Sequence, residues 1–213
     1  MNAAPDISLR QSGFSMIEVL VTLIILLVGL LGLAGLMVQS QHSEMESYQR
    51  VQALILLQDM VGRINANRKV ASCYVFTPTT LSSPASSSTY LGTGSTVSPA
   101  CITGTTAQNA QAIQDMNAWN TLLTGAAEVS GGNNVGAMVG ARGCVSYGAG
   151  TELHDVNGAA IPGTGIYTVA VAWQGLGSTG IATPLCAEGL YGTNDAQRRV
   201  VSLTMRTASL TAS

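Results

Sequence analysis

The chain has 213 residues, a formal net charge of −2, and only 9% charged residues. A typical soluble domain has about 25% charged residues, so this composition is unusually poor in charge. The negative net charge and the lack of a basic block exclude general binding to nucleic acid, which requires a positively charged surface. The length fits one domain together with a long N-terminal helix.

A long apolar segment lies close to the N-terminus. Residues 14–38 contain a single charged residue, Glu18. About 20 predominantly apolar residues are enough for a helix to cross a bilayer, so we expect residues 14–38 to form a transmembrane helix. A carboxylate in such a helix is costly and therefore indicates a function. A polar leader, residues 1–13, precedes the helix and ends in Gly13.

Three interpretations of this N-terminus differ in where the chain is cut. A secretory signal has an apolar core of about 7–15 residues and a small-residue cleavage site behind it, whereas this run is longer and is followed by polar residues. An ordinary membrane anchor fits the length but leaves Glu18 unexplained. Cleavage before the run, after Gly13, retains the whole helix, and glycine gives a peptidase close access to the backbone. We favour the third interpretation.

The motif Gly13-Phe14-x-x-x-Glu18 at the head of an apolar helix resembles the class III signal of type IV pilins and pseudopilins. The resemblance implies that prepilin peptidase cuts between Gly13 and Phe14 and methylates the new Phe14 amine. In a bundle of such helices, the Glu18 carboxylate would meet the Phe14 amine of a neighbour and set the register. The alternative is that Glu18 only complements the positive end of the helix dipole.

Residues 39–70 are expected to continue the helix beyond the membrane. Apolar residues recur there at steps of three and four, which predicts an amphipathic helix with one face on a core. The basic residues Arg63, Arg68 and Lys69 suit the negative end of the helix dipole. The predicted core face consists of Met45, Tyr48, Val51, Leu54, Ile55, Val61 and Ile64.

The cysteines all lie beyond the apolar run, at Cys73, Cys101, Cys144 and Cys186. None forms a C-x-x-C pair or a cysteine–histidine cluster with zinc-like spacing. An even number after an export signal indicates two disulfides in an oxidising compartment. Among the possible pairings we favour the sequential one, because each bond would then close a loop-rich segment and contribute about 3–4 kcal/mol.

The remaining residues, 71–213, are predicted to form a globular domain stapled by these disulfides. Residues 77–100 are rich in Ser, Thr, Pro and Gly and lack helical periodicity, which predicts a surface loop or irregular β structure that buries little. A second helix is predicted over residues 107–123, with Thr105 or Thr106 as its cap, Gly125 as its stop and Trp119 as a core anchor. The glycines of residues 131–143 do not follow the order of a phosphate-binding loop.

Three strands are predicted, over residues 143–147, 166–173 and 198–207. The second and third alternate apolar with small or polar residues, as half-buried antiparallel strands do. The sequence therefore predicts an α+β fold, in which a long N-terminal helix, half transmembrane and half amphipathic, packs against a small antiparallel sheet.

A second pattern resembles the PilV-type minor pilins of type IV pili. It consists of Cys101, Asp115 and Trp119, then Tyr167-Thr168-Val169-x-Val171-x-Trp173, then Cys186 and Arg198-Arg199-Val200. The resemblance implies a single-pass inner-membrane protein with a periplasmic domain, later incorporated in a pilus at the cell surface. Its partners would be prepilin peptidase, other minor pilins, the major pilin and a tip adhesin. Adhesion and twitching motility would be downstream outcomes.

Two alternatives remain open: a minor pseudopilin of a type II secretion system, and a membrane-anchored extracytoplasmic binding domain that keeps its leader. We expect no enzyme, no cofactor and no metal site. His154-Asp155 has no nucleophile placed beside it by a local motif, so we expect a surface loop. Thr193-Asn194-Asp195 offers one carboxylate, too little for a calcium loop, and predicts a turn.

Overall fold

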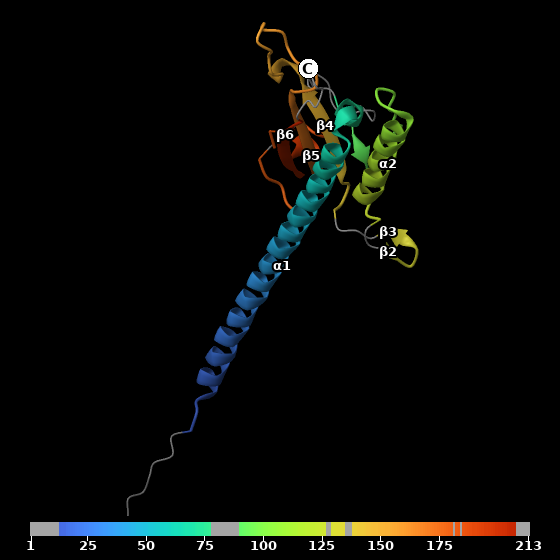
Figure 1. The fold of residues 1–213 in the computed structure, drawn as a ribbon. Helices are drawn as coiled ribbons and strands as arrows, with labels where there is room; N and C mark the ends of the chain where they lie inside the picture. The colour runs from blue at the N-terminus through green and yellow to red at the C-terminus, as the bar shows by residue number, and fades with distance from the viewer. Residues whose placement is uncertain are drawn as a thin grey trace, which may run out of the picture. The chain divides into compact units, whose positions relative to one another are not determined.

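The computed structural model describes residues 13–77, 90–126, 129–134, 138–180, 182–183 and 185–207. Apart from Gly13, the predicted leader therefore lies outside the described residues. Contacts divide the chain into two units, Met1–Glu44 and Met45–Ser213. Helix α1, Met16–Ala66, contributes to both units (Figure 1). In the first unit every residue from 13 to 38 is exposed, and α1 is long and apolar enough to cross a membrane.

The second unit contains a four-stranded antiparallel sheet with the strand order β1-β4-β5-β6. The strands are β1 (Leu91–Gly92), β4 (Arg142–Gly148), β5 (Ile166–Gln174) and β6 (Arg198–Arg206). The three predicted strands match β4, β5 and β6 to within one residue at each end. β6 lies at one edge of the sheet, and the short β1 lies at the other.

Two short strands outside this sheet, β2 (Val129–Ser130) and β3 (Asn133–Asn134), pair as a hairpin that the sequence analysis did not predict. Gly131 and Gly132 form its turn with φ angles of 57° and 81°. Such a two-residue turn requires positive φ at both positions, which glycine adopts without steric cost. The structure also contains 3-10 turns η1 (Arg68–Tyr74), η2 (Ala149–Thr151) and η3 (Thr193–Asp195).

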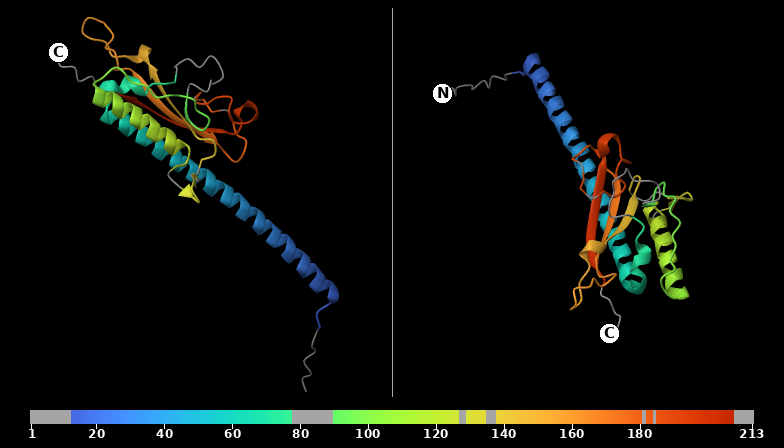
Figure 2. Two further views of the ribbon diagram at one scale, coloured as in Figure 1. Left: turned by 90° about the vertical axis from the view of Figure 1, so that its right-hand side faces the viewer. Right: turned by 90° about the horizontal axis from the view of Figure 1, so that it is seen from above.

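Helix α2, Thr106–Leu123, lies alongside the last turns of α1 on one face of the sheet (Figure 2). The Thr105 hydroxyl accepts a hydrogen bond from the Gln108 amide, and the Gln108 side chain accepts one from the Thr105 amide, which is a capping box. Gly125 follows the helix with φ 87°. The predicted cap and stop are confirmed.

The main core lies between the two helices and the sheet. Leu57 and Met60 of α1 pack in one cluster with Trp119 of α2 and with Val169 and Val171 of β5. Trp119 is fully buried, and its indole N–H donates to the Leu56 carbonyl at 2.8 Å. The predicted core anchor is therefore confirmed.

The predicted core face of the amphipathic helix was wrong. The buried residues of α1 are Gln49, Ala53, Leu57, Met60 and Ile64, and of the predicted set only Ile64 is among them, with Val61 partly buried. Both faces of this helix are apolar, and both follow the same period. Periodicity alone therefore could not distinguish the face that packs from the face that stays exposed.

Two further expectations were wrong. The segment 77–100 was expected to bury little, but Tyr90 and Leu91 are buried. The pairing of Leu91 with Gly143 of β4 agrees with the alternative of irregular β structure. Residues 78–89 of this segment lie outside the described residues. β5 was expected to be half-buried, yet Ala170 and Ala172 on its second face are also buried. A loop containing Cys186 and Tyr191 packs against that face and covers it.

The two disulfides join Cys73 to Cys101 and Cys144 to Cys186, the sequential pairing. The second bond ties the covering loop to β4. A buried ion pair organises the same loop: Arg198, 1% exposed, places its Nε 3.1 Å from Asp195 Oδ2 and donates to the Cys186 carbonyl at 3.1 Å. Asp195 also accepts hydrogen bonds from the amides of Gly189 and Tyr191.

The predicted turn at residues 193–195 is confirmed, but its buried carboxylate was not foreseen. Arg198 and backbone N–H groups occupy the positions around Asp195 that a cation would need. His154 and Asp155 lie on an exposed loop, where Asp155 Oδ1 accepts from the amides of Asn157 and Ala159. Within the described ranges, no group of His, Cys, Asp or Glu is arranged to hold a metal ion.

Gly143→Ala tests the packing of β4 on α2. A Cβ at this position would overlap the Trp119 ring, so the substitution should lower the free energy of unfolding by about 1–3 kcal/mol. Gly150→Ala is the control, because nothing lies within 4 Å of its Cβ, and its effect should stay within about 0.5 kcal/mol. Urea unfolding of the purified chain, followed by tryptophan fluorescence, measures both. Equal stability of the two variants would contradict this packing.

Candidate functional site

The N-terminal motif lies at the open end of α1. Residues 13–15 precede the helix and are exposed, and the Phe14 side chain is 85% exposed. The first backbone hydrogen bonds of the helix run from the amides of Glu18 and Val19 to the Ser15 carbonyl. Exposed, non-helical backbone is the form of substrate that proteases cleave. The peptide bond between Gly13 and Phe14 is thus accessible.

Glu18 is exposed in the first turn of α1. A carboxylate at this position complements the partial positive charge of the helix N-terminus. Among the described residues it forms no ion pair. Hydrolysis of the Gly13–Phe14 bond would create a cationic amine one helical turn before Glu18.

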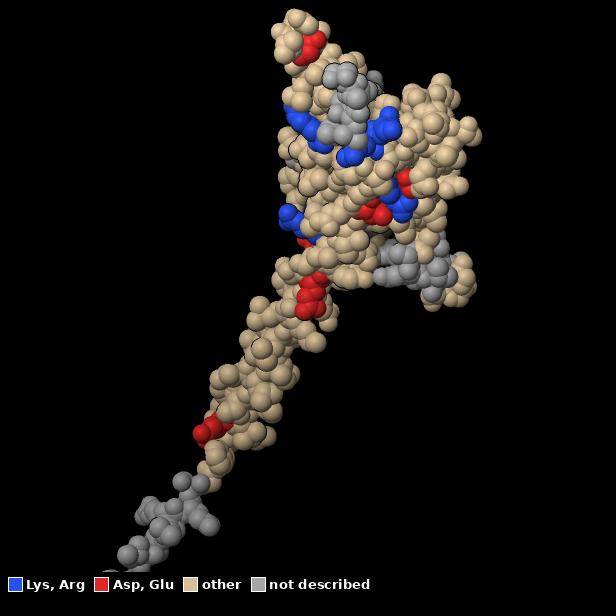
Figure 3. Space-filling model, viewed as in Figure 1, with Lys and Arg blue, Asp and Glu red and all other residues tan. Residues whose placement is uncertain are grey.

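The side chains of residues 14–38 form a long apolar surface. All of these residues are exposed, and Figure 3 shows that the visible surface of this part is almost entirely uncharged. Leaving apolar surface in water costs about 25 cal/mol per Å². Contiguous apolar surface of this extent marks contact with a membrane or with other proteins.

A second apolar surface lies on α1 within the second unit. It comprises Tyr48, Val51, Leu54 and Ile55, which are 53%, 54%, 40% and 59% exposed, and we call it the outer stripe. Since the opposite face of the helix, with Ala53 and Leu57, is buried in the core, α1 has apolar side chains on both sides. The outer stripe is therefore a second candidate contact surface.

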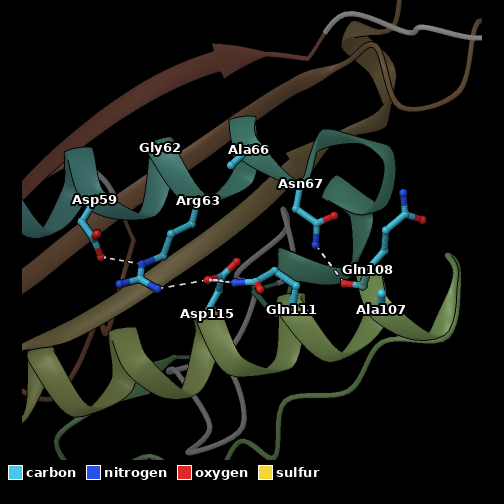
Figure 4. Close-up of a pocket in the computed structure, with 9 residues that line it drawn as sticks. All are labelled: Asp59, Gly62, Arg63, Ala66, Asn67, Ala107, Gln108, Gln111 and Asp115. Carbon is cyan, nitrogen blue, oxygen red and sulfur yellow. Dashed lines mark hydrogen bonds and ion pairs between the residues drawn. The ribbon is translucent and has the colours of Figure 1, made fainter.

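A polar cluster lies at the end of α1, where Arg63 bridges two carboxylates. Arg63 Nε donates to Asp59 Oδ2 at 2.8 Å, and its Nη1 donates to Asp115 Oδ1 at 3.1 Å (Figure 4). The hydrogen bond to Asp59 is the main reason why the pKa of Arg63 is raised. Arg63 lies in the last turn of α1, as expected, and its side chain also reaches α2, a contact that the sequence did not predict.

Asp115 is the buried member of this cluster, and sequence reasoning did not assign it a role. Tyr74 donates to its Oδ2 at 2.6 Å, and Gln111 donates to its Oδ1 at 2.9 Å. Burial, followed by the hydrogen bond to Asp115, raises the pKa of Tyr74, so the phenol keeps its proton and remains a donor. The available signal was a carboxylate one turn before Trp119, on the predicted apolar face of α2.

A hollow of about 570 Å³ opens beside this cluster, between the last turns of α1 and the first half of α2 (Figure 4). Its lining includes the small residues Gly62, Ala66 and Ala107 together with Asp59, Arg63 and Asp115. We call it the α1–α2 hollow. Asn67, Gln108 and Gln111 complete its lining.

Comparison with known proteins identifies one feature of the chain. The family model for the prokaryotic N-terminal methylation motif matches residues 8–34, which include Gly13, Phe14 and Glu18. No curated protein and no solved structure matched the chain. Proteins with this motif are structural subunits rather than enzymes.

Leu57→Ala and Ile55→Ser test which face of α1 is packed. Truncation of fully buried Leu57 should leave a cavity and lower the free energy of unfolding by about 2–5 kcal/mol. Ile55 is 59% exposed, so its replacement should change stability by no more than about 0.5 kcal/mol. Denaturant unfolding of the two purified variants measures both values. A larger loss for Ile55→Ser than for Leu57→Ala would reverse the assignment of the faces.

Proposed function

We propose that this type IV pilin-like protein is a minor pilin of a type IV pilus. The observation that carries the proposal is the methylation motif at the head of a helix whose residues 14–38 are all exposed and apolar. Prepilin peptidase would remove residues 1–13 and methylate the amine of Phe14. The mature helix would then leave the inner membrane and enter a filament.

Assembly replaces lipid contacts of the apolar helix with contacts to the helices of other subunits. Lipid tails are as apolar as leucine, so transfer between membrane and filament requires only that the helices pack well. The domain of residues 45–213 stays outside the membrane, where its two disulfides form under oxidising conditions. The function is therefore assembly rather than catalysis.

Glu18 would determine the register of that packing. In an apolar filament core, a free carboxylate is costly, and the Phe14 amine of a neighbour is the partner that cleavage creates. An ion pair in such surroundings favours the one arrangement that pairs both charges over the many that leave one unpaired. The outer stripe would add a second contact to neighbouring subunits, since about half of each side chain's surface is exposed.

A minor rather than a major subunit, similar to PilV, is the more specific form of the proposal. Support comes from the arrangement of Cys101, Asp115 and Trp119 with the strand Tyr167-Thr168-Val169-x-Val171-x-Trp173 and with Cys186. The partners would be other minor pilins, the major pilin and an adhesin at the tip. A pseudopilin of a type II secretion system shares the N-terminal motif, and it would co-purify with a secretin-linked short filament instead of a long pilus.

The mass of the mature N-terminal peptide tests the proposal. A chain that begins at a methylated Phe14 supports processing, and its presence in sheared long filaments supports the pilus. A membrane-anchored binding domain would instead begin at Met1. A mature chain that begins beyond Val38 would exclude a filament role for the apolar helix.

Gly13→Arg should leave the precursor uncut, because a long charged side chain blocks close approach of the peptidase to the backbone. Immunoblots should show a single precursor band in the membrane fraction and none in sheared filaments. Gly13→Ala is the matched control and should still be cut, since a methyl group occupies little space. Normal processing of Gly13→Arg would show that the cleavage site lies elsewhere in the chain.

Glu18→Val should be processed normally but poorly incorporated, because it removes the partner of the Phe14 amine and keeps the helix apolar. The measurement is the ratio of mature protein in sheared filaments to mature protein in membranes. Thr22→Val is the control one turn later, because the Thr22 hydroxyl bonds only to the Val19 carbonyl of its own helix. If Glu18→Val is incorporated as well as the wild type, the pairing of Glu18 with the Phe14 amine is not needed for assembly.

A further inference from the structure

The α1–α2 hollow has an excess of negative charge. One guanidinium, that of Arg63, faces the two carboxylates of Asp59 and Asp115. The two are not equivalent, because Asp115 is 7% exposed and accepts from Tyr74, Arg63 and Gln111. Asp59 is 33% exposed, and among the described residues it pairs only with Arg63, through Oδ2. Asp59 is thus the carboxylate that is open to an incoming cation.

The rest of the lining consists of small apolar residues and of amide side chains that are already bonded: Asn67 donates to the Gln108 carbonyl, the Gln108 side chain accepts from the Thr105 amide, and Gln111 donates to Asp115. Gly62 and Ala66 on α1 and Ala107 on α2 line it without any polar side-chain group. A ligand that fits must therefore combine an aliphatic stem with a positive charge. Lysine and arginine side chains have this form, since their methylene groups pack on apolar surface while the charged head finds a polar partner. An acidic side chain would be repelled, and a purely apolar one would bury Asp59 without a new partner.

The position of the hollow points to its partner. Ile55 of the outer stripe and Asp59 are one helical turn apart, so they lie on the same side of α1. A protein that contacts the outer stripe therefore also reaches the hollow. Arg68 and Lys69 follow in η1, but they are exposed and do not line the hollow.

We propose that the α1–α2 hollow receives a lysine or arginine side chain of a neighbouring filament subunit, whose cation binds Asp59. The inference rests on the proposed function, because the neighbour is a subunit of the same filament. It assigns to the hollow a role in selecting which subunit can sit beside this one.

Ala66→Phe tests the inference by filling the hollow from its exposed rim. Its level in sheared filaments should fall about fivefold relative to the wild type. Asn65→Phe is the matched control, because Asn65 is the adjacent exposed residue and does not line the hollow, and its level should be unchanged. Thermal unfolding of both purified variants checks that neither loses the fold.

Cross-linking identifies the occupant directly. A carbodiimide joins a carboxylate to a lysine amine, so it should link Asp59 to a neighbouring subunit, and Asp59→Asn should abolish the product. The carbodiimide does not link arginine, so a photoreactive benzophenone amino acid at position 66 captures the occupant in that case. Mass spectrometry of both products should locate a basic residue of another subunit.

Equal incorporation of Ala66→Phe and Asn65→Phe would overturn the inference. A benzophenone product that maps to a segment without lysine or arginine would do the same. Failure of the proposed function looks different, because then the wild-type chain itself begins at Met1 or is absent from sheared filaments. In that case the inference falls with the function on which it rests.

Discussion

The structure depends on a helix that has apolar side chains on two opposite sides. Within the second unit, one side of α1 contributes Leu57 and Met60 to the core, and the core holds the sheet and α2 in place. The other side presents the outer stripe, whose side chains are between 40% and 59% exposed. A single molecule buries only the first of these two apolar sides. The same helix that organises the domain therefore also presents an exposed apolar surface.

The polar network at the end of α1 joins three segments that are distant in sequence. Asp115 of α2 accepts hydrogen bonds from Tyr74 of η1 and from Arg63 of α1. Removing one partner of such a buried group costs more than the interaction contributes when it is complete. This network fixes α2 against α1 and so maintains the walls of the α1–α2 hollow. The proposed selection of a neighbour thus depends on buried groups that the neighbour never contacts.

Local signals predicted the parts of this fold that local chemistry determines. The ends of α2 follow from Thr105 and Gly125, and β5 and β6 follow from alternation along the chain. The core face of α1 could not be predicted, since Ile55 and Leu57 are equally apolar. Neither could the role of Asp115, because Tyr74 and Arg63 lie 41 and 52 residues away from it. The N-terminal motif could be recognised because its residues lie close together in the sequence.

The open edge of the sheet at β6 matters once many copies are held close together. An unpaired strand of nine residues can pair with the same strand of another molecule and start aggregation. Arg199 and Arg206 lie near its two ends, and both donate to loop carbonyls, of Gly177 and of Thr151 and Thr164. Arg199 is also held by an ion pair with Glu46 of α1 at 3.0 Å. Charged side chains held in place along an edge strand hinder an identical strand from pairing there, so this edge is protected against sheet-to-sheet association.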